Sequence, residues 1–259
     1  MRIKVILILL FLSTLVVRAD DINSDNYLRL GMEHGLSQSF IHSIIQDKTG
    51  FMWFGTNDGL NRYDGYTFKN FYNNLTDNIS ISNNQVRKLA LAPNGCIWAG
   101  TEDGLNCYDP ETGKFKRYFI HTPTSKNFYI GNLITDKEGI IWFSYRDDPY
   151  LISLNPKTGK SEYFKLPVPK NNYWSANEDN SFTLCTNVII QNYRGQFWIG
   201  TNQGTIILFD KSQKKFIKQY TISEQTPVSS IVEMDNQRLC VATVDKGFCF
   251  VNTNTGKQG

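Results

Sequence analysis

Short apolar segments separated by turn-forming residues run along most of the chain, and their spacing predicts β-strands. Between residues 86 and 120 four such segments follow one another: Val86–Ala92, Cys96–Thr101, Leu105–Asp109 and Lys114–Ile120. Asn, Asp, Pro and Gly stand between them, and the last segment alternates polar and aromatic residues as a half-exposed strand does. This pattern predicts a four-stranded antiparallel sheet joined by short turns.

The same pattern occurs five times along the chain. Ile41–Gly65 is repeated at Val86–Asp109, Ile130–Asn155 and Val188–Asp210, and a degenerate copy lies at Val228–Asn252. The equivalent positions of the second strand are Trp53, Trp98, Trp142, Trp198 and Cys240, which lie 45, 44, 56 and 42 residues apart. A period in the forties with four short strands per copy is typical of β-propeller blades. We therefore predict an all-β protein, a β-propeller of four-stranded antiparallel blades with about five blades, at 36–74, 80–121, 128–166, 182–222 and 226–259.

The repeated tryptophan favours a packing role. A large ring on the second strand of every copy fills the gap between neighbouring sheets, whereas a ladder of ligand-stacking rings is the less favoured interpretation. Gly55, Gly100 and Gly200 follow the tryptophan by two residues and predict a close backbone approach or a bulge. Asp47 and Asp136 stand three residues before a turn glycine, so we expect them to form turns and not to catalyse.

The first 19 residues predict a signal peptide. Arg2 and Lys4 precede the apolar run Val5–Val17, and a cleavage site fits after Ala19. This run of 13 residues falls short of the roughly 20 that a membrane-spanning helix needs, which disfavours a membrane anchor. We expect a periplasmic chain of residues 20–259 with no membrane span after cleavage.

The charge balance argues against nucleic acid as a partner. Removal of Arg2, Lys4 and Arg18 leaves 27 − 3 = 24 basic residues against 24 acidic ones. A net charge near zero lacks the basic surface that nucleic acid attracts. The basic stretch Lys211–Lys218 is expected to be the solvated side of an outer strand.

Five cysteines in an exported chain first suggest disulfides. Cys96, Cys107, Cys240 and Cys249, however, fall inside predicted strands, where other copies carry apolar or small residues. No CxxC pair is present, so the sequence carries no metal or redox signal. We expect free thiols that pack as small hydrophobic side chains, and no metal or other cofactor.

The repeat resembles the two-component regulator propeller repeat. Its features are an apolar strand, Asp-x-x-Gly, an apolar-Trp-apolar-Gly-Thr strand and Gly-Leu-x-x-Tyr-Asp; they are nearly complete in Asp47–Asp64 and good in Asn94–Asp109. The resemblance implies the extracytoplasmic sensor region of a hybrid two-component system, a hybrid sensor histidine kinase and response regulator of Gram-negative bacteria that degrade glycans. It also implies an oligosaccharide signal, a homodimer in the full-length sensor, and a cytoplasmic kinase that this chain lacks.

The resemblance implies seven-bladed rings, and the chain is too short for one. The last copy stops after Gly256-Lys257, where the second copy continues from Gly113-Lys114 into an outer strand. We therefore expect a fragment with an incomplete ring. Closure into five blades, with Tyr27–Leu30 as the missing outer strand, is the alternative.

The third copy predicts a ligand site, because it departs from its siblings at two places on one face of the disc. Ser144–Pro149 replaces the Gly-Thr-x-x-Gly loop, and Pro167–Ser181 lengthens the connection to the next blade. Aromatic rings stack on sugars, while Arg and Asp hydrogen-bond hydroxyl groups or carboxylates. We predict a glycan site lined by Tyr145, Arg146, Asp147, Asp148, Tyr173 and Trp174. The alternative is sequence drift without function, with Trp174 folded onto the disc.

Two other classes of function stay open. A free-standing periplasmic glycan-binding or scaffold propeller would use the same repeats. An exported propeller enzyme is less favoured, because His34, His42 and His121 lie on different strands or connections and no catalytic constellation can be assembled around them.

Overall fold

The structure is a computed structural model that describes residues 28–167, 184–224, 226–235 and 237–259, and strands β1 to β19 form five antiparallel sheets within it. Sheet 1 holds β1 (Ile41–Gln46), β2 (Met52–Thr56), β3 (Gly59–Tyr63) and β4 (Phe68–Phe71). Sheet 2 holds β5 (Val86–Leu91), β6 (Ile97–Thr101), β7 (Gly104–Asp109) and β8 (Lys114–Tyr118). Sheet 3 holds β9 (Ile130–Thr135), β10 (Ile141–Tyr145), β11 (Tyr150–Leu154) and β12 (Ser161–Lys165). Sheet 4 holds β13 (Thr186–Gln191), β14 (Phe197–Thr201), β15 (Thr205–Asp210) and β16 (Lys215–Thr221). Sheet 5 holds β17 (Val228–Asp235), β18 (Arg238–Thr243) and β19 (Phe248–Asn252).

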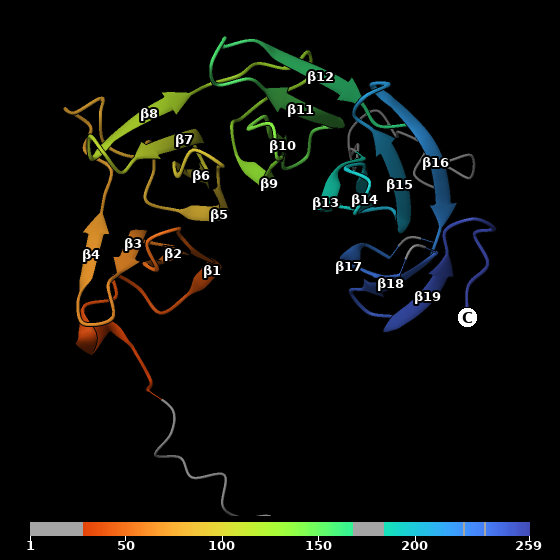
Figure 1. The fold of residues 1–259 in the computed structure, drawn as a ribbon, viewed down its shortest axis with the longest axis horizontal. Coiled ribbons are helices and arrows are strands. Elements are labelled where there is room, and N and C mark those ends of the chain that lie inside the picture. Colours follow the sequence, from red (N-terminus) through yellow and green to blue (C-terminus); the bar gives the residue numbers. More distant parts are fainter. Residues whose placement is uncertain (1–27, 168–183, 225, 236) are drawn as a thin grey trace, which may run out of the picture.

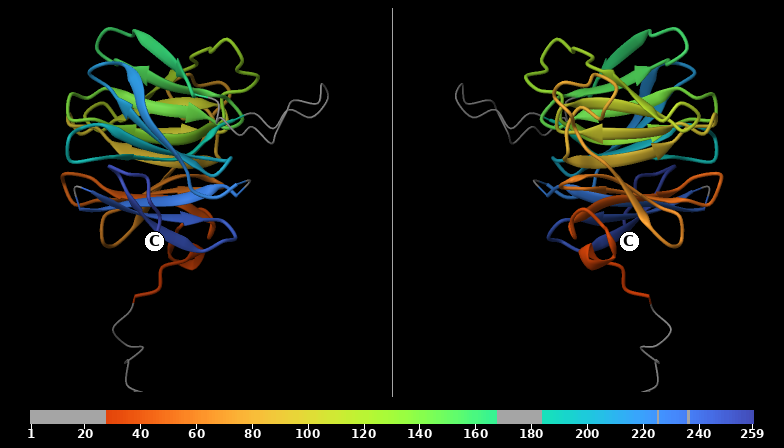
Figure 2. Two further views of the ribbon diagram at one scale, coloured as in Figure 1. Left: turned by 90° about the vertical axis from the view of Figure 1, so that its right-hand side faces the viewer. Right: turned by 90° about the vertical axis from the view of Figure 1, so that its left-hand side faces the viewer.

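The sheets stand around a common axis as an open arc, with β1, β5, β9, β13 and β17 innermost (Figure 1). Figure 2 shows the same arc from two sides, turned by 90° from the view of Figure 1. The all-β propeller architecture predicted from the repeats is confirmed. A short 3₁₀ turn at Met32–His34 precedes the first blade.

Within the described residues the arc does not close into a five-bladed ring. Figure 1 shows a gap between sheet 1 and sheet 5. Leu28–Leu30 forms no strand, so the described part of the alternative outer strand does not complete sheet 5. Gly259 instead pairs with Phe250 of β19, through reciprocal backbone hydrogen bonds of 2.9 and 3.0 Å. The residues that follow β19 in the chain therefore occupy the start of the fourth strand position of sheet 5.

The repeated tryptophans hold neighbouring sheets together, as their spacing predicts. All four are at most 5% exposed. The ring of Trp53 lies 5.2 Å from that of Tyr108 in sheet 2, and Trp142 lies 5.0 Å from Phe197 in sheet 4. Burial of such large rings is a main source of stability at a sheet-to-sheet contact.

The glycine two residues after each tryptophan makes room for the next blade. A Cβ atom on Gly55, Gly100 or Gly200 would lie only 2.9, 2.5 and 2.5 Å from a side-chain atom of the next sheet's innermost strand. The atoms concerned belong to Val86, Ile130 and Val228, which are the first residues of β5, β9 and β17. These glycines therefore set how closely consecutive blades approach near the axis.

All five cysteines are free thiols. Cys107, Cys240 and Cys249 lie within β7, β18 and β19, whereas Cys96 stands one residue before β6. Among the described residues no helix is long and apolar enough to span a membrane.

Candidate functional site

The two faces of the disc carry different connections. We call the face that carries residues 57–58, 102–103 and 146–149, between the second and third strands, the loop face. The opposite face carries the turns between first and second strands and between third and fourth strands, and we call it the turn face. The predicted site loop, Ser144–Pro149, lies on the loop face between β10 and β11.

Tyr145 and Asp148 are buried and anchor this loop. The Tyr145 hydroxyl donates a 2.7 Å hydrogen bond to the Ile120 carbonyl, and burial raises the pKa of the tyrosine. Asp148 is 2% exposed and accepts hydrogen bonds of 2.6 Å from the Thr122 hydroxyl and 3.3 Å from the Thr124 hydroxyl. All three partners belong to the connection between β8 and β9 that leads into sheet 3, so Tyr145 and Asp148 tie the loop to its own blade.

Arg146 and Asp147 point outward instead. Their side chains are 63% and 72% exposed, and Arg146 Nε lies 3.9 Å from Asp147 Oδ2. Asp147 has a φ of 61°, a left-handed conformation that Asp tolerates better than most residues and that turns the chain sharply. The structure thus separates the predicted loop residues into two buried anchors and two exposed groups. Tyr173 and Trp174 lie outside the described residues.

Arg146 is held over an aromatic ring that the sequence analysis did not single out. Its guanidinium carbon lies 5.2 Å from the centre of the Tyr129 ring, and its backbone N–H donates a 2.9 Å hydrogen bond to the Tyr129 carbonyl. The guanidinium of Arg87, from β5 of sheet 2, approaches the same ring at 5.6 Å. Such cation–π contacts hold a guanidinium in place while leaving its N–H groups free to donate.

Arg87 continues the polar surface toward sheet 1. Its Nε donates to Glu102 at 3.1 Å, and its Nη1 donates to the Asn57 amide oxygen at 2.9 Å and contacts Nε2 of His42. These groups come from three blades and meet where the innermost strands begin. We call them the axial rim: His42, Asn57, Arg87, Glu102, Tyr129, Arg146 and Asp147.

Two β-bulges, one in β1 and one in β5, each direct one of these side chains. The pairing register shifts between Ile41 and Ser43 in β1 and between Val86 and Lys88 in β5, which leaves His42 and Arg87 as the extra residues. Bulges redirect side chains and are common beside functional sites. The only signal in the sequence was a polar residue just after the first apolar residue of an innermost strand, which is too weak to identify a bulge.

The chemistry available at the axial rim is polar recognition. It offers guanidinium and amide donors, carboxylate acceptors and one aromatic face. The described residues contain no group of three or more His, Cys, Asp or Glu side chains that could hold a metal ion.

Residues 35–58 match the family model described as the two component regulator propeller. The chain carries a two-component regulator propeller repeat. Histidine kinase P4 of Formosa agariphila is 58% identical to it over 48 residues, which are 18% of this chain and 4% of that kinase.

Two solved structures show the same fold. The extracellular domain of a protein described as a hybrid two component system of B. thetaiotaomicron is 24% identical, with a TM-score of 0.54, and the alignment covers 88% of this chain and 35% of that domain. A virginiamycin B lyase of Staphylococcus aureus is 14% identical, with a TM-score of 0.67 and coverage of 90% and 71%. The chain thus spans about a third of the length of the B. thetaiotaomicron domain. At these identities both likenesses bear on the fold alone.

Proposed function

We propose that this chain is the ligand-sensing propeller of a hybrid two-component system, that it works in the periplasm, and that its ligand is an oligosaccharide. The match of residues 35–58 to the two-component regulator propeller is the observation that carries this proposal. The signal peptide expected at residues 1–19, the cytoplasmic histidine kinase partner and a homodimer in the full-length sensor are parts of the same proposal.

The axial rim supports oligosaccharide recognition. Arg146 presents a hydrogen-bond donor to solvent, and Asp147 presents an acceptor. The Tyr129 ring contacts the guanidinium groups of both Arg146 and Arg87 and holds them in place. A sugar needs both kinds of hydrogen-bonding group at fixed positions, since its hydroxyl groups donate and accept. Tyr145 and Asp148 contribute as anchors of the loop, and Tyr173 and Trp174 belong to the proposed site on the sequence argument.

Calorimetry with oligosaccharides of hexoses and of uronic acids tests ligand binding. We expect Arg146→Ala to weaken the binding of the cognate oligosaccharide by about tenfold, the effect of losing one charge-assisted hydrogen bond. Arg194→Ala is the matched control, because its guanidinium lies at the same 5.2 Å from the Tyr193 ring but on the turn face. Equal losses in the two variants, or no binding by any oligosaccharide, would contradict the proposal.

Export is tested separately. A fusion of residues 1–40 to alkaline phosphatase should be active, because that enzyme needs the oxidising periplasm to form its disulfides. An inactive fusion, with an active control that carries a known signal peptide, would remove the periplasmic assignment.

A further inference from the structure

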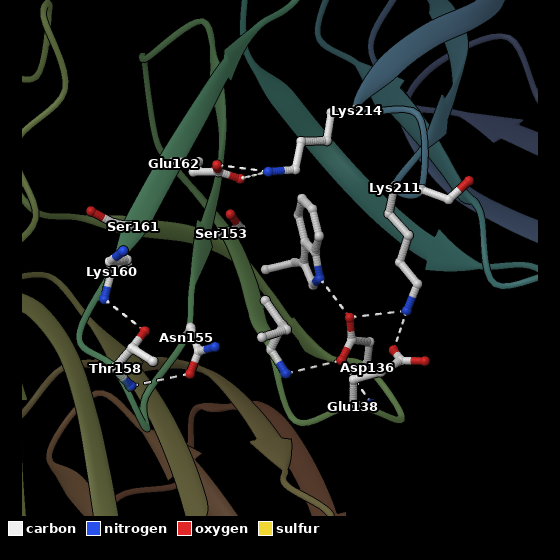
Figure 3. Close-up of a pocket in the computed structure, with 13 residues that line it drawn as sticks. Asp136, Glu138, Ser153, Asn155, Thr158, Lys160, Ser161, Glu162, Lys211 and Lys214 are labelled. Atoms are coloured by element: carbon white, nitrogen blue, oxygen red, sulfur yellow. Dashed lines mark hydrogen bonds and ion pairs between the residues drawn. The ribbon is translucent and has the colours of Figure 1, made fainter.

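A cleft of about 680 Å³ opens between sheets 3 and 4 on the turn face, opposite the axial rim. Trp142 and Ile140 form the apolar part of its wall, and Ser153 and Asn155 add polar groups from β11 and the turn that follows it. Figure 3 shows Lys211 and Lys214 reaching over from sheet 4 toward Asp136, Glu138 and Glu162, with Ser153 on the sheet 3 side of the cleft. A volume of this size lies within the range of about 300–1,000 Å³ that is typical of small-molecule sites.

One residue per blade differs in step with the volumes of three equivalent clefts between neighbouring sheets. It is the cross-strand neighbour of the tryptophan, which is Arg62, Cys107, Ser153 and Leu208 in sheets 1 to 4. The clefts that contain Ser153, Cys107 and Leu208 measure 680, 410 and 190 Å³, so their volumes fall as this side chain grows. In sheet 1 the long Arg62 side chain lies over the Phe51 ring, with its guanidinium carbon at 4.5 Å.

Ser153 is also a polar group without a protein partner. It is 8% exposed, and among the described residues no side chain or backbone group hydrogen-bonds its hydroxyl. Among the described residues the buried side-chain atoms without a hydrogen-bond partner are Arg62 Nε, Asn70 Oδ1 and Thr186 Oγ1, so the Ser153 oxygen is open to the cleft, where water or a ligand can bond it. The hydroxyl lines the cleft and therefore offers a donor and an acceptor to whatever occupies it.

Three lysines and three carboxylates line the cleft, and all of them except Lys160 are joined in ion pairs among the described residues. Lys211 Nζ lies 3.1 Å from Asp136 Oδ2 and also contacts Glu138, and Lys214 Nζ lies 2.7 Å from both oxygens of Glu162. Both sets of ion pairs join sheet 4 to sheet 3. A ligand that binds Lys211, Lys214 or their carboxylate partners by charge would have to break these pairs, whereas an uncharged ligand would leave them intact.

We propose that this cleft is a second binding site and that it takes an uncharged, hydroxyl-rich ring such as a neutral pyranose unit. The apolar face of the ring packs on Trp142 and Ile140, and one ring hydroxyl bonds Ser153. The site lies on the opposite face from the axial rim, and binding in the cleft does not depend on ligand binding at the axial rim.

Nuclear magnetic resonance of the purified chain tests the proposal, with the indole N–H signal of Trp142 as reporter. The probes are neutral methyl pyranosides and, for comparison, methyl glucuronide. At least one neutral pyranoside should move the Trp142 signal at about 10 mM, as expected for a millimolar affinity. Ser153→Leu should abolish the shift by filling the cleft, and Ser153→Ala should weaken binding about three- to tenfold, the effect of one hydrogen bond.

Cys107→Leu is the matched control, because it fills the equivalent cleft between sheets 2 and 3 and should leave the Trp142 response unchanged. Ser153→Ala keeps the test informative if Ser153→Leu does not fold. The proposal is overturned if no neutral pyranoside moves the signal, if only the glucuronide does, or if the response persists unchanged in the Ser153 variants. Arg146→Ala should leave this response intact, which separates the cleft from the axial rim.

Discussion

Asp136 accepts a hydrogen bond from the indole N–H of Trp142, with 2.9 Å between the nitrogen and Oδ2. The other carboxylate oxygen accepts the backbone N–H groups of Glu138 and Ile140 at 3.0 and 2.9 Å. Asp47 binds Trp53 in the same way at 2.7 Å. The aspartate therefore closes the turn between the first two strands and fixes the ring that packs on the next blade. Its assignment as a turn residue is confirmed, and the bond to the tryptophan adds a second role.

Replacement of this aspartate should destabilise the propeller. Asp136→Ala removes the acceptor of the Trp142 indole N–H and of two backbone N–H groups. It also removes one of the two carboxylates that Lys211 contacts. We therefore expect the free energy of unfolding to fall by about 2–4 kcal/mol. Urea unfolding measures the loss. Asp64→Ala is the control, because Asp64 caps an exposed turn at Tyr66 and Thr67 and should cost clearly less. Similar losses in the two variants would show that the bond to the indole contributes little.

Gly100→Ala should also destabilise the chain, because the new Cβ would lie 2.5 Å from Ile130 Cγ2 across the gap between sheets 2 and 3. Forcing an extra methyl group into a packed contact costs about 1–3 kcal/mol. A double-mutant cycle with Ile130→Ala identifies the cause, because the alanine penalty should shrink once the clashing side chain is removed. An unchanged penalty would place the strain in the backbone of β6 instead.

Stability should fall in acid because several carboxyl groups have a lowered pKa in the folded chain. Hydrogen bonds from Ser212 and Gln196 lower the pKa of Asp210 to about 2. For Asp136, burial alone would raise the pKa, but hydrogen bonds from Trp142, Ile140 and Lys211 outweigh it and lower it below the ordinary value of 3.8. A lowered folded pKa means that the ionised group stabilises the fold above the unfolded pKa and loses this effect as the pH falls toward the folded pKa.

The urea midpoint should therefore be flat above about pH 5 and decline between about pH 4 and pH 2. Asp210→Asn should start from a lower midpoint at pH 6 and show a shallower decline. A wild-type midpoint that stays constant down to pH 2 would mean that these carboxyl groups do not contribute.

The cysteines should titrate as five thiols in denaturant without a reducing agent, because the structure holds all five as free thiols. In the native chain Cys107 and Cys185 should react slowly with alkylating reagents at pH 8, since burial raises the pKa of both thiols and the thiolate is the reactive form. Mass spectrometry after alkylation locates the modified residues. A count of three or one would reveal disulfides that the structure lacks.

The repeat itself was readable from the sequence because it depends on local rules. Turn residues, strand-length apolar runs and the tryptophan at a period in the forties predicted the sheets, and in the second copy the strand limits agree with β5 to β8 except for small shifts, such as two residues at the end of β8. These local rules predicted the roles of the site residues only in part. Tyr145 and Asp148 look like ligand-binding residues in the sequence, but their partners Ile120 and Thr122 lie more than 20 residues away.

The sequence by itself determined the all-β class, the blade period, the packing role of Trp142 and the turn role of Asp136, because each follows from a pattern that recurs from blade to blade. Only the tertiary structure decided that Arg87 and Arg146 share the Tyr129 ring and that Ser153 opens a cleft against Lys211 and Lys214. These features form between blades. Their chemistry depends on which side chains come into contact between two blades, and the spacing of residues along the chain does not determine which side chains these are.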